Sequence, residues 1–168
     1  ETAARVAAAG GNAVDAALAA NAVLTVVYPH MSSIGGDVMA LISRPDGTTL
    51  AIDGSGAWPR ALDSEIARGG WSLPMTGPQT VTVPGTLDAW KQMLDEGGSI
   101  PFARLLEPAI AAAGEGVAVS RSLATALGGL GTSAGAGAFP PGFRHGASLG
   151  EGDVMRQGEL AATLVTLG

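Results

Sequence analysis

The chain has 168 residues, 46% of them hydrophobic, and this size suits one compact unit with a buried core. Its net charge is -6 and it has only nine Lys and Arg residues, so it lacks the basic surface that binds a phosphate backbone. We therefore expect no nucleic-acid partner. Cysteine is absent, which excludes disulfides, thiolate chemistry and Cys-based zinc sites.

The apolar content does not predict a membrane span. The most apolar segment, Ala13–Val27, is interrupted by Asp15, Asn21 and Thr25, and it is shorter than the about 18 residues that a span requires. The sequence starts at Glu1 without a basic and apolar leader, so we expect that any targeting segment was removed or lies outside it. The 26 glycines, beside three Trp, three Phe and one Tyr, predict a core packed by close backbone approach.

Two helices are predicted at the start of the chain. Residues 2–9 have a helical composition and end at a glycine pair. Asn12, followed three residues later by Asp15, forms a variant of the capping box, so a second helix should begin there and run to about Val27. Pro29 ends it, because a proline pushes the preceding residue out of the α region.

A hairpin is predicted next. Asp46-Gly47 supplies the positive φ of a tight turn between the apolar runs 38–42 and 50–52, which we interpret as two antiparallel strands. A short helix is predicted near residues 63–68. Alternation over Thr80–Val83 predicts a third strand.

Most of the chain after Thr86 is predicted to be helical. Thr86 is predicted to cap one helix, and a second runs over residues 99–114. Ser120 is predicted to cap a short helix that ends at Leu127. The segment 128–150 is rich in Gly, Ala, Ser and Pro and is predicted to be a loop, and a last helix starts at about Gln157.

Two glycine-rich motifs match enzyme signatures by letters alone. Residues 129–134 fit a dinucleotide fingerprint, but that motif requires a strand before it. Residues 131–135 fit the nucleophile elbow of serine hydrolases, which also follows a strand, and His145 would be the only downstream base. We interpret both as loop sequence and keep a serine hydrolase as the rival enzyme class.

His30 and His145 are the two imidazoles of the chain, and no helix carries paired ligands at metal-binding spacing. We therefore predict no metal site. His30 lies in a loop between Pro29 and Ser32, and we interpret it as hydrogen-bonded to backbone, with a place near an active site as the alternative. Spacing alone identifies no catalytic residue in this chain.

A series of motifs in one order resembles the γ-glutamyltranspeptidase family. Their order and approximate spacing are similar to those of the N-terminal half of that family's large subunit, over nearly all of residues 1–168. The matching motifs are Gly10–Ala17, Pro29-His30, Ser33–Gly36, Asp53-Gly54, Val83–Thr86, Glu107–Ile110, Gly114, Gly116, Gly152-Asp153 and Arg156-Gln157.

This resemblance implies an α+β fold, as part of the four-layer αββα sandwich of N-terminal nucleophile hydrolases. It also implies a precursor that cuts itself into two subunits, with residues 1–168 as a single-domain N-terminal portion of the large one. The nucleophile would be the new N-terminal Thr of the small subunit, activated by its own α-amino group. No catalytic residue would lie in this chain, which would be inactive alone. No cofactor is implied, and a periplasmic or extracellular location is favoured.

One position departs from the family pattern. In γ-glutamyl enzymes that resemble this chain, an Arg after the Asp-Gly pair grips the substrate's α-carboxylate, whereas here Asp53-Gly54 is followed by Ser55. A hydroxyl provides neither the charge nor the fork of a guanidinium, so Ser55 is the candidate substrate-binding position. Three functions stay open. They are γ-glutamyl transfer with glutathione hydrolysis, hydrolysis of glutaryl-type or other non-γ-glutamyl amides, and a non-catalytic truncated homologue.

Overall fold

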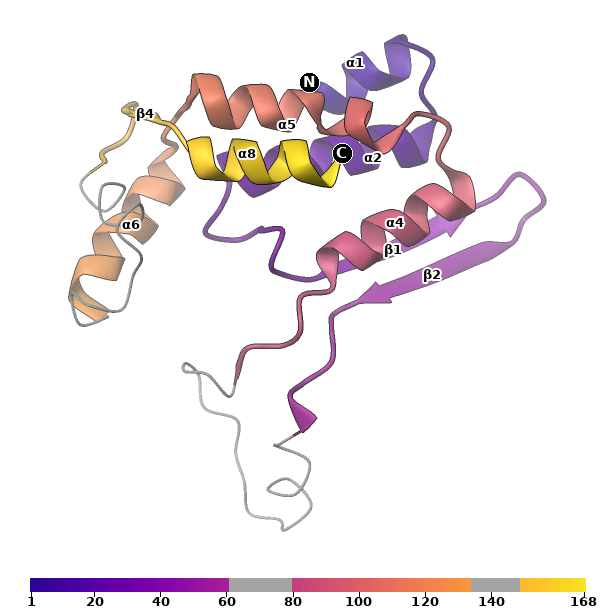
Figure 1. The fold of residues 1–168 in the computed structure, drawn as a ribbon, viewed down its shortest axis with the longest axis horizontal. Helices are drawn as coiled ribbons and strands as arrows, with labels where there is room; N and C mark the ends of the chain where they lie inside the picture. Colours follow the sequence, from indigo (N-terminus) through magenta and orange to yellow (C-terminus); the bar gives the residue numbers. More distant parts are fainter. Residues whose placement is uncertain (61–79, 134–148) are drawn as a thin grey trace. The chain divides into compact units, whose positions relative to one another are not determined.

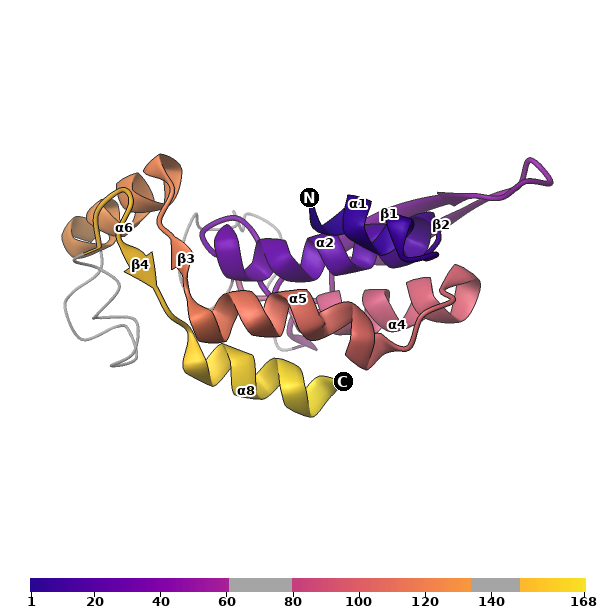
Figure 2. The ribbon, with the colours of Figure 1, turned by 90° about the horizontal axis from the view of Figure 1, so that it is seen from above.

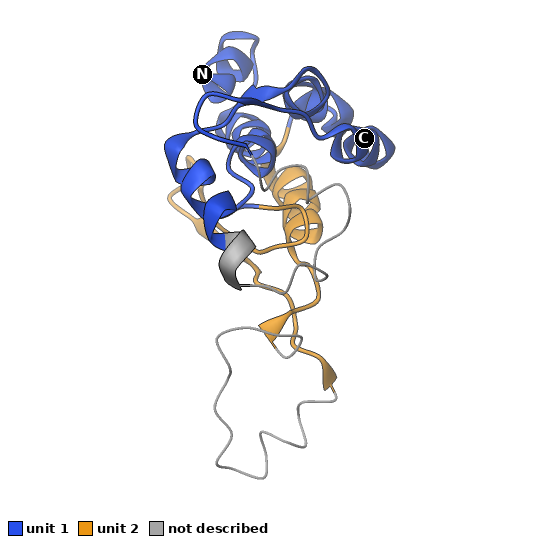
Figure 3. Ribbon diagram, turned by 90° about the vertical axis from the view of Figure 1, so that its left-hand side faces the viewer, with its two compact units in different colours: residues 1–32, 99–168 blue, residues 33–98 orange. Residues whose placement is uncertain are grey.

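The computed structural model describes residues 1–60, 80–133 and 149–168 (Figure 1). The chain divides into two compact units, one of residues 1–32 and 99–168 and the other of residues 33–98 (Figure 3). Each unit combines helices with one antiparallel pair of strands. The described residues therefore have the predicted α+β composition.

Four helices form the main layer of the first unit: α1 (Thr2–Ala8), α2 (Ala13–Val27), α5 (Phe102–Glu115) and α8 (Gly158–Leu167). Helix α2 packs against α1 and α5, and α8 packs against α5 (Figure 2). The close packing depends on small side chains, as the composition predicted. Fully buried alanines alternate with leucines along the contact, namely Leu18, Ala19, Ala22, Leu105, Leu106, Ala109, Ala113 and Leu164.

The capping box at the start of α2 is confirmed. The Asn12 side chain accepts hydrogen bonds from the Val14 N–H at 2.8 Å and the Asp15 N–H at 3.1 Å, and Asp15 Oδ2 accepts from the Asn12 N–H at 2.9 Å. Asp15 also accepts from the Ser99 N–H and the Ser99 hydroxyl, at 2.9 and 2.5 Å, and from the Ile100 N–H at 3.2 Å. This buried carboxylate therefore fixes the start of α2 to the segment that leads into α5.

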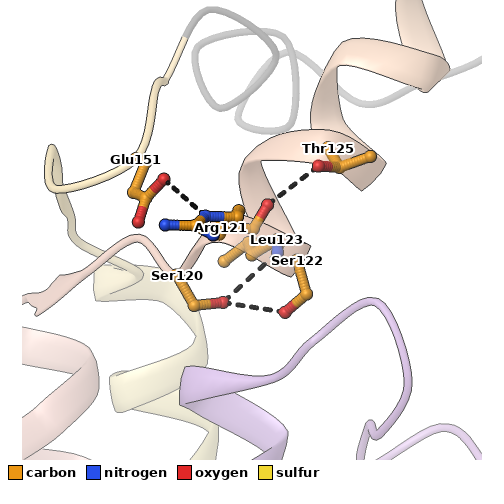
Figure 4. A network of polar contacts seen from close by, with 6 residues as sticks. All are labelled: Ser120, Arg121, Ser122, Leu123, Thr125 and Glu151. Carbon is orange, nitrogen blue, oxygen red and sulfur yellow. Dashed lines mark hydrogen bonds and ion pairs between the residues drawn. The ribbon is translucent and has the colours of Figure 1, made fainter.

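The same unit contains a small second layer made of β3 (Val117–Ala118), β4 (Val154–Met155) and α6 (Arg121–Ser133). Ser120 caps α6 as predicted, because its hydroxyl accepts the Leu123 N–H at 3.2 Å (Figure 4). The predicted end at Leu127 is wrong, and so is the predicted loop over residues 128–133, since α6 continues to Ser133. Residues 134–148 of the predicted loop lie outside the described residues. Burial of Leu123 and Leu127 against Met155 anchors the helix and outweighs the about 1 kcal/mol that each helical glycine costs.

The second unit consists of β1 (Val38–Ser43), β2 (Thr49–Gly54) and α4 (Thr86–Gly97). The strands form the predicted hairpin, paired from Val38 opposite Gly54 to Ser43 opposite Thr49, and Gly47 adopts a φ of 85° in its turn. Helix α4 packs on both strands. The interior of this unit is formed by Ile52, Ala89, Trp90 and Met93.

Two predictions for this unit are wrong. Residues 81–85 form no strand, because Val83 donates a single backbone hydrogen bond, to the Ala57 carbonyl at 2.8 Å, and Val81 and Val83 are exposed. Thr86 is not the cap of α4, since Gly85 is the N-cap residue and the Thr86 hydroxyl donates instead to the Ser33 carbonyl at 3.2 Å. The short helix predicted near residues 63–68 lies outside the described residues.

Candidate functional site

The segment that carries Ser55 passes very close to the start of α4. A Cβ atom built on Gly85 would lie 2.1 Å from the Gly54 carbonyl oxygen, and one built on Gly56 would lie 1.9 Å from the Val83 carbonyl oxygen. Gly56 also has a φ of 72°, a conformation that side-chain-bearing residues rarely adopt. Only glycine fits at positions 56 and 85, where the backbone after β2 passes against the backbone that leads into α4. We call this close approach the glycine crossing, and Ser55 lies in it.

A third segment completes the crossing. The Gly36 carbonyl accepts hydrogen bonds from the N–H groups of Gly85 and Thr86, each at 3.1 Å. The Ser33 hydroxyl accepts the Gly35 N–H at 3.2 Å, and the Ser33 carbonyl accepts the Gly36 N–H at 3.2 Å. Three motifs that are separate in sequence, at residues 33–36, 53–54 and 83–86, thus meet within one unit.

Ser55 itself lies in a turn that follows β2. Its N–H donates to Asp53 Oδ1 at 3.0 Å, the side-chain-to-backbone pattern that makes aspartate favourable in turns. Hydrogen bonds from the Ser55 hydroxyl and from the Ser55 N–H lower the pKa of Asp53 below its ordinary value. The Ser55 N–H is therefore bonded to the Asp53 carboxylate.

The charged side chain that contacts Ser55 is a carboxylate and not a cation. Asp53 is ionised at neutral pH and exposed, so it repels an incoming carboxylate. Of the described cations of this unit, Arg44 pairs with Glu96 and Lys91 pairs with Asp95, whereas Arg60, five residues after Ser55, is exposed. The role of Asp53 was missed from the sequence, although its spacing of two residues from Ser55 is a turn signal.

The described part of the two glycine-rich motifs lies in a helix. Residues 129–133 lie in the last turns of α6, so the strand that either signature requires does not precede them. Residues 134 and 135 and His145 lie outside the described residues. The interpretation of residues 129–133 as loop is wrong, because they continue the helix.

The interpretation of His30 as bonded to backbone is also wrong. Both of its ring nitrogens are buried, and neither has a hydrogen-bond partner among the described residues. In that part of the chain no group of three or more His, Cys, Asp and Glu side chains could hold a metal ion. None of the helices described is long and apolar enough to span a membrane.

The sequence model of the family described as Gamma-glutamyltranspeptidase matches residues 1–168. The chain therefore belongs to the gamma-glutamyltranspeptidase family, a family of hydrolases and transferases. This confirms the family that the motifs suggested.

Two curated relatives illustrate the range of the family. The oxamate amidohydrolase proenzyme of Klebsiella pneumoniae is 42% identical over 123 residues, which are 70% of this chain and 23% of the relative. The acylase ACY 1 proenzyme of Pseudomonas sp. (strain SE83) is 34% identical over 130 residues, covering 71% of this chain and 23% of the relative. The chain thus spans about a quarter of the length of these relatives, both named proenzymes.

Solved structures agree with the fold. A cephalosporin acylase from Bacillus halodurans superposes with a TM-score of 0.86 at 33% identity, over 99% of this chain and 33% of that one. The gamma-glutamyltranspeptidase of Helicobacter pylori gives a TM-score of 0.78 at 31% identity, over 97% of this chain and 49% of that one. The predicted fold class of N-terminal nucleophile hydrolases is confirmed.

Proposed function

We propose that residues 1–168 are the N-terminal portion of the large subunit of a self-cleaving amide hydrolase or acyltransferase. The partner is a small subunit that begins with the catalytic Thr, and neither a cofactor nor a metal takes part. Family membership over the whole chain and the proenzyme names of its relatives support this assignment. The chain alone, without that Thr, is inactive.

The chemistry follows from the properties of an N-terminal Thr. Its α-amino group takes the hydroxyl proton as the oxygen attacks the amide carbonyl, and the proton is passed to the leaving amine when the tetrahedral intermediate collapses. An oxyanion hole stabilises the negative oxygen of that intermediate. Water then attacks the acyl-enzyme to release the acid, or a second amine accepts the acyl group. In each case the Thr hydroxyl is regenerated.

We assign the substrate to non-γ-glutamyl amides whose acyl group lacks both the amino group and the carboxylate of an α-amino acid head, which excludes glutaryl amides as well as γ-glutamyl amides. The observation that carries this assignment is the uncharged Ser55 beside the Asp53 carboxylate, at the position where related enzymes carry an Arg. A substrate carboxylate that enters a partly buried site without a cation loses hydration without compensation. Relatives named oxamate amidohydrolase and acylase show that the family includes enzymes named for other amides.

Hydrolysis of γ-glutamyl amides is the second candidate. It is favoured by the family's name and by relatives named glutathione hydrolase, including the Escherichia coli proenzyme at 29% identity over 167 residues. It requires a cation from another part of the protein to take the place of the missing Arg.

Steady-state kinetics of the full-length, matured protein distinguish the two candidates. We expect kcat/KM for an uncharged acyl compound, butyryl-p-nitroanilide, to exceed that for γ-glutamyl-p-nitroanilide, because only the second brings a carboxylate to a site without Arg. A clear preference for the γ-glutamyl compound would reverse the assignment. Turnover of neither compound, by a protein that has matured, would exclude both substrates and favour a smaller acyl group.

A further inference from the structure

Exposed apolar side chains gather at the glycine crossing, on both of the segments that meet there. Trp58, Val81 and Val83 are 55%, 63% and 60% exposed. The Val83 N–H donates to the Ala57 carbonyl at 2.8 Å, so the segment that follows β2 and the segment that leads into α4 lie side by side (Figure 1). The three apolar side chains therefore belong to one small region of the second unit.

Secondary structure does not account for the exposure of these side chains. Val81 and Val83 alternate with threonines in the pattern of a half-buried strand, but among the described residues no strand pairs with this segment. Single exposed apolar residues are common in proteins, whereas several in one place are typical of a binding surface. These three side chains are therefore positioned to bind an apolar group.

The candidate substrate position lies in the same region. Ser55 is half-buried and uncharged, and it precedes Trp58 by three residues, which span at most about 11 Å. Gly56, between them, has a φ of 72° and passes against the Val83 backbone, so the path of this short segment is fixed. A ligand that contacts Ser55 is thus within reach of the apolar side chains.

We propose that Trp58, Val81 and Val83 bind the acyl chain of the substrate, and that the enzyme therefore selects amides of aliphatic acids several carbons long. The inference rests on the proposed function, which places an uncharged acyl group at Ser55. Burial of the chain removes apolar surface of both partners from water, so each added methylene group strengthens binding. Trp58, the largest of the three side chains, is then a specificity-determining residue.

A series of acyl chain lengths tests this inference in the full-length, matured protein. We expect kcat/KM to rise about threefold to fourfold per methylene group from acetyl- through butyryl- to hexanoyl-p-nitroanilide, because the leaving group stays the same. The gain should appear mainly as a lower KM, since the chain binds equally in the ground state and the transition state. A value of kcat/KM that stays constant or falls with chain length would overturn the inference and would mean that another part of the protein covers these side chains.

Substitutions assign the chain-length dependence to this region. Trp58→Asn should lower the gain per methylene group by at least half, so that its loss grows with chain length, and Trp58→Phe should retain most of the gain. Val83→Thr, of nearly the same volume, should lower the gain as well. Val165→Asn changes a 61% exposed apolar residue of α8 in the first unit and should keep the wild-type dependence. A wild-type dependence in both Trp58→Asn and Val83→Thr would contradict the proposal.

A matched pair of substrates tests the role of charge. Arg60 is exposed two residues after Trp58 and is the cation that could attract a carboxylate here. Pentanoyl- and glutaryl-p-nitroanilide have the same chain length, and we expect faster turnover of the pentanoyl compound. Faster turnover of the glutaryl compound would overturn the inference, because the region would then bind a charged chain end.

The outcomes separate this inference from the proposed function. A preference for butyryl- over γ-glutamyl-p-nitroanilide without any effect of chain length would support the proposed function and overturn the inference. If the full-length protein contains no second polypeptide, the proposed function fails, and calorimetric binding of hexanamide and acetamide decides the inference. Tighter binding of hexanamide by the wild type, lost in Trp58→Asn, would support it, and equal or absent binding would overturn it.

Discussion

At the scale of single residues, Ser55 determines which substrates we expect. Its N–H donates to the Asp53 carboxylate, and its own side chain is short and uncharged. An Arg at this position would replace a short, uncharged side chain with a charged fork that can bind a carboxylate in two places.

Ser55→Arg should therefore increase γ-glutamyl turnover. A hydrogen bond to a charged group contributes about 1.5–3 kcal/mol, which corresponds to about a 10-fold to 100-fold gain in kcat/KM for γ-glutamyl-p-nitroanilide. Ser55→Ala removes the hydroxyl without adding charge and serves as the control, for which we expect no gain. Equal kinetics for the two variants would mean that the site is organised around another residue.

In the first unit, Asp15 has a structural role, whereas Ser55 of the second unit is a candidate substrate-binding residue. Burial by itself would raise the pKa of this carboxyl group, but the Ser99 hydroxyl and three backbone N–H groups that donate to it lower the pKa below its ordinary value. A carboxyl group whose folded pKa is lowered stabilises the fold above its unfolded pKa.

Asp15→Asn should destabilise the protein at neutral pH by about 2 kcal/mol, because an amide accepts fewer of these hydrogen bonds and has no charge. The part of the wild-type free energy of unfolding that depends on the Asp15 charge is fully present above about pH 5. It is lost as the pH falls through the unfolded pKa of about 3.9 and then through the lower folded pKa. Urea unfolding of both proteins at several pH values measures it. Asp95→Asn, on an exposed ion pair, should change stability by less than about 1 kcal/mol. A difference in free energy of unfolding between wild type and Asp15→Asn that stays the same at pH 2 would contradict the role of the charge.

At the scale of elements, the glycine crossing joins the hairpin to α4. Gly85→Ala places a methyl group 2.1 Å from the Gly54 carbonyl oxygen, so the backbone must move. We expect a loss of about 3 kcal/mol in the free energy of unfolding. Gly114→Ala is the matched control, because the exposed Gly114 lies in α5 with nothing within 4 Å of an added Cβ, and it should stabilise the protein by about 0.5–1 kcal/mol. Similar unfolding midpoints for the two variants would show that the backbone at Gly54 and Gly85 can move apart with little loss of stability.

Elements with local signals were predictable from the sequence. The capping residues Asn12 and Ser120 and the Asp46-Gly47 turn each act within a few residues, and the structure has all three. The alternation at Thr80–Val83 was misleading, because a strand also needs a partner, which period alone cannot show. The same limit applies to the candidate site. The position of Ser55 followed from the motif, but its bond to Asp53 depends on how the backbone turns.

At the scale of the whole molecule, the proposed function makes each unit one portion of a larger fold. The hairpin presents Met39 and Leu41 on its outer face, where they are 74% and 76% exposed. In a four-layer sandwich the two sheets pack face to face, so we expect this face to be covered in the full protein. Such long-range contacts cannot be predicted from local pattern, whereas the order of motifs along 168 residues identified the family.

Intact mass and N-terminal sequencing of the purified, denatured full-length protein test the central claim most directly. We expect two polypeptides, the second of which begins with Thr, because the proposed chemistry requires a free α-amino group beside the attacking hydroxyl. A single uncut polypeptide in a folded protein would contradict the account and would favour a non-catalytic homologue.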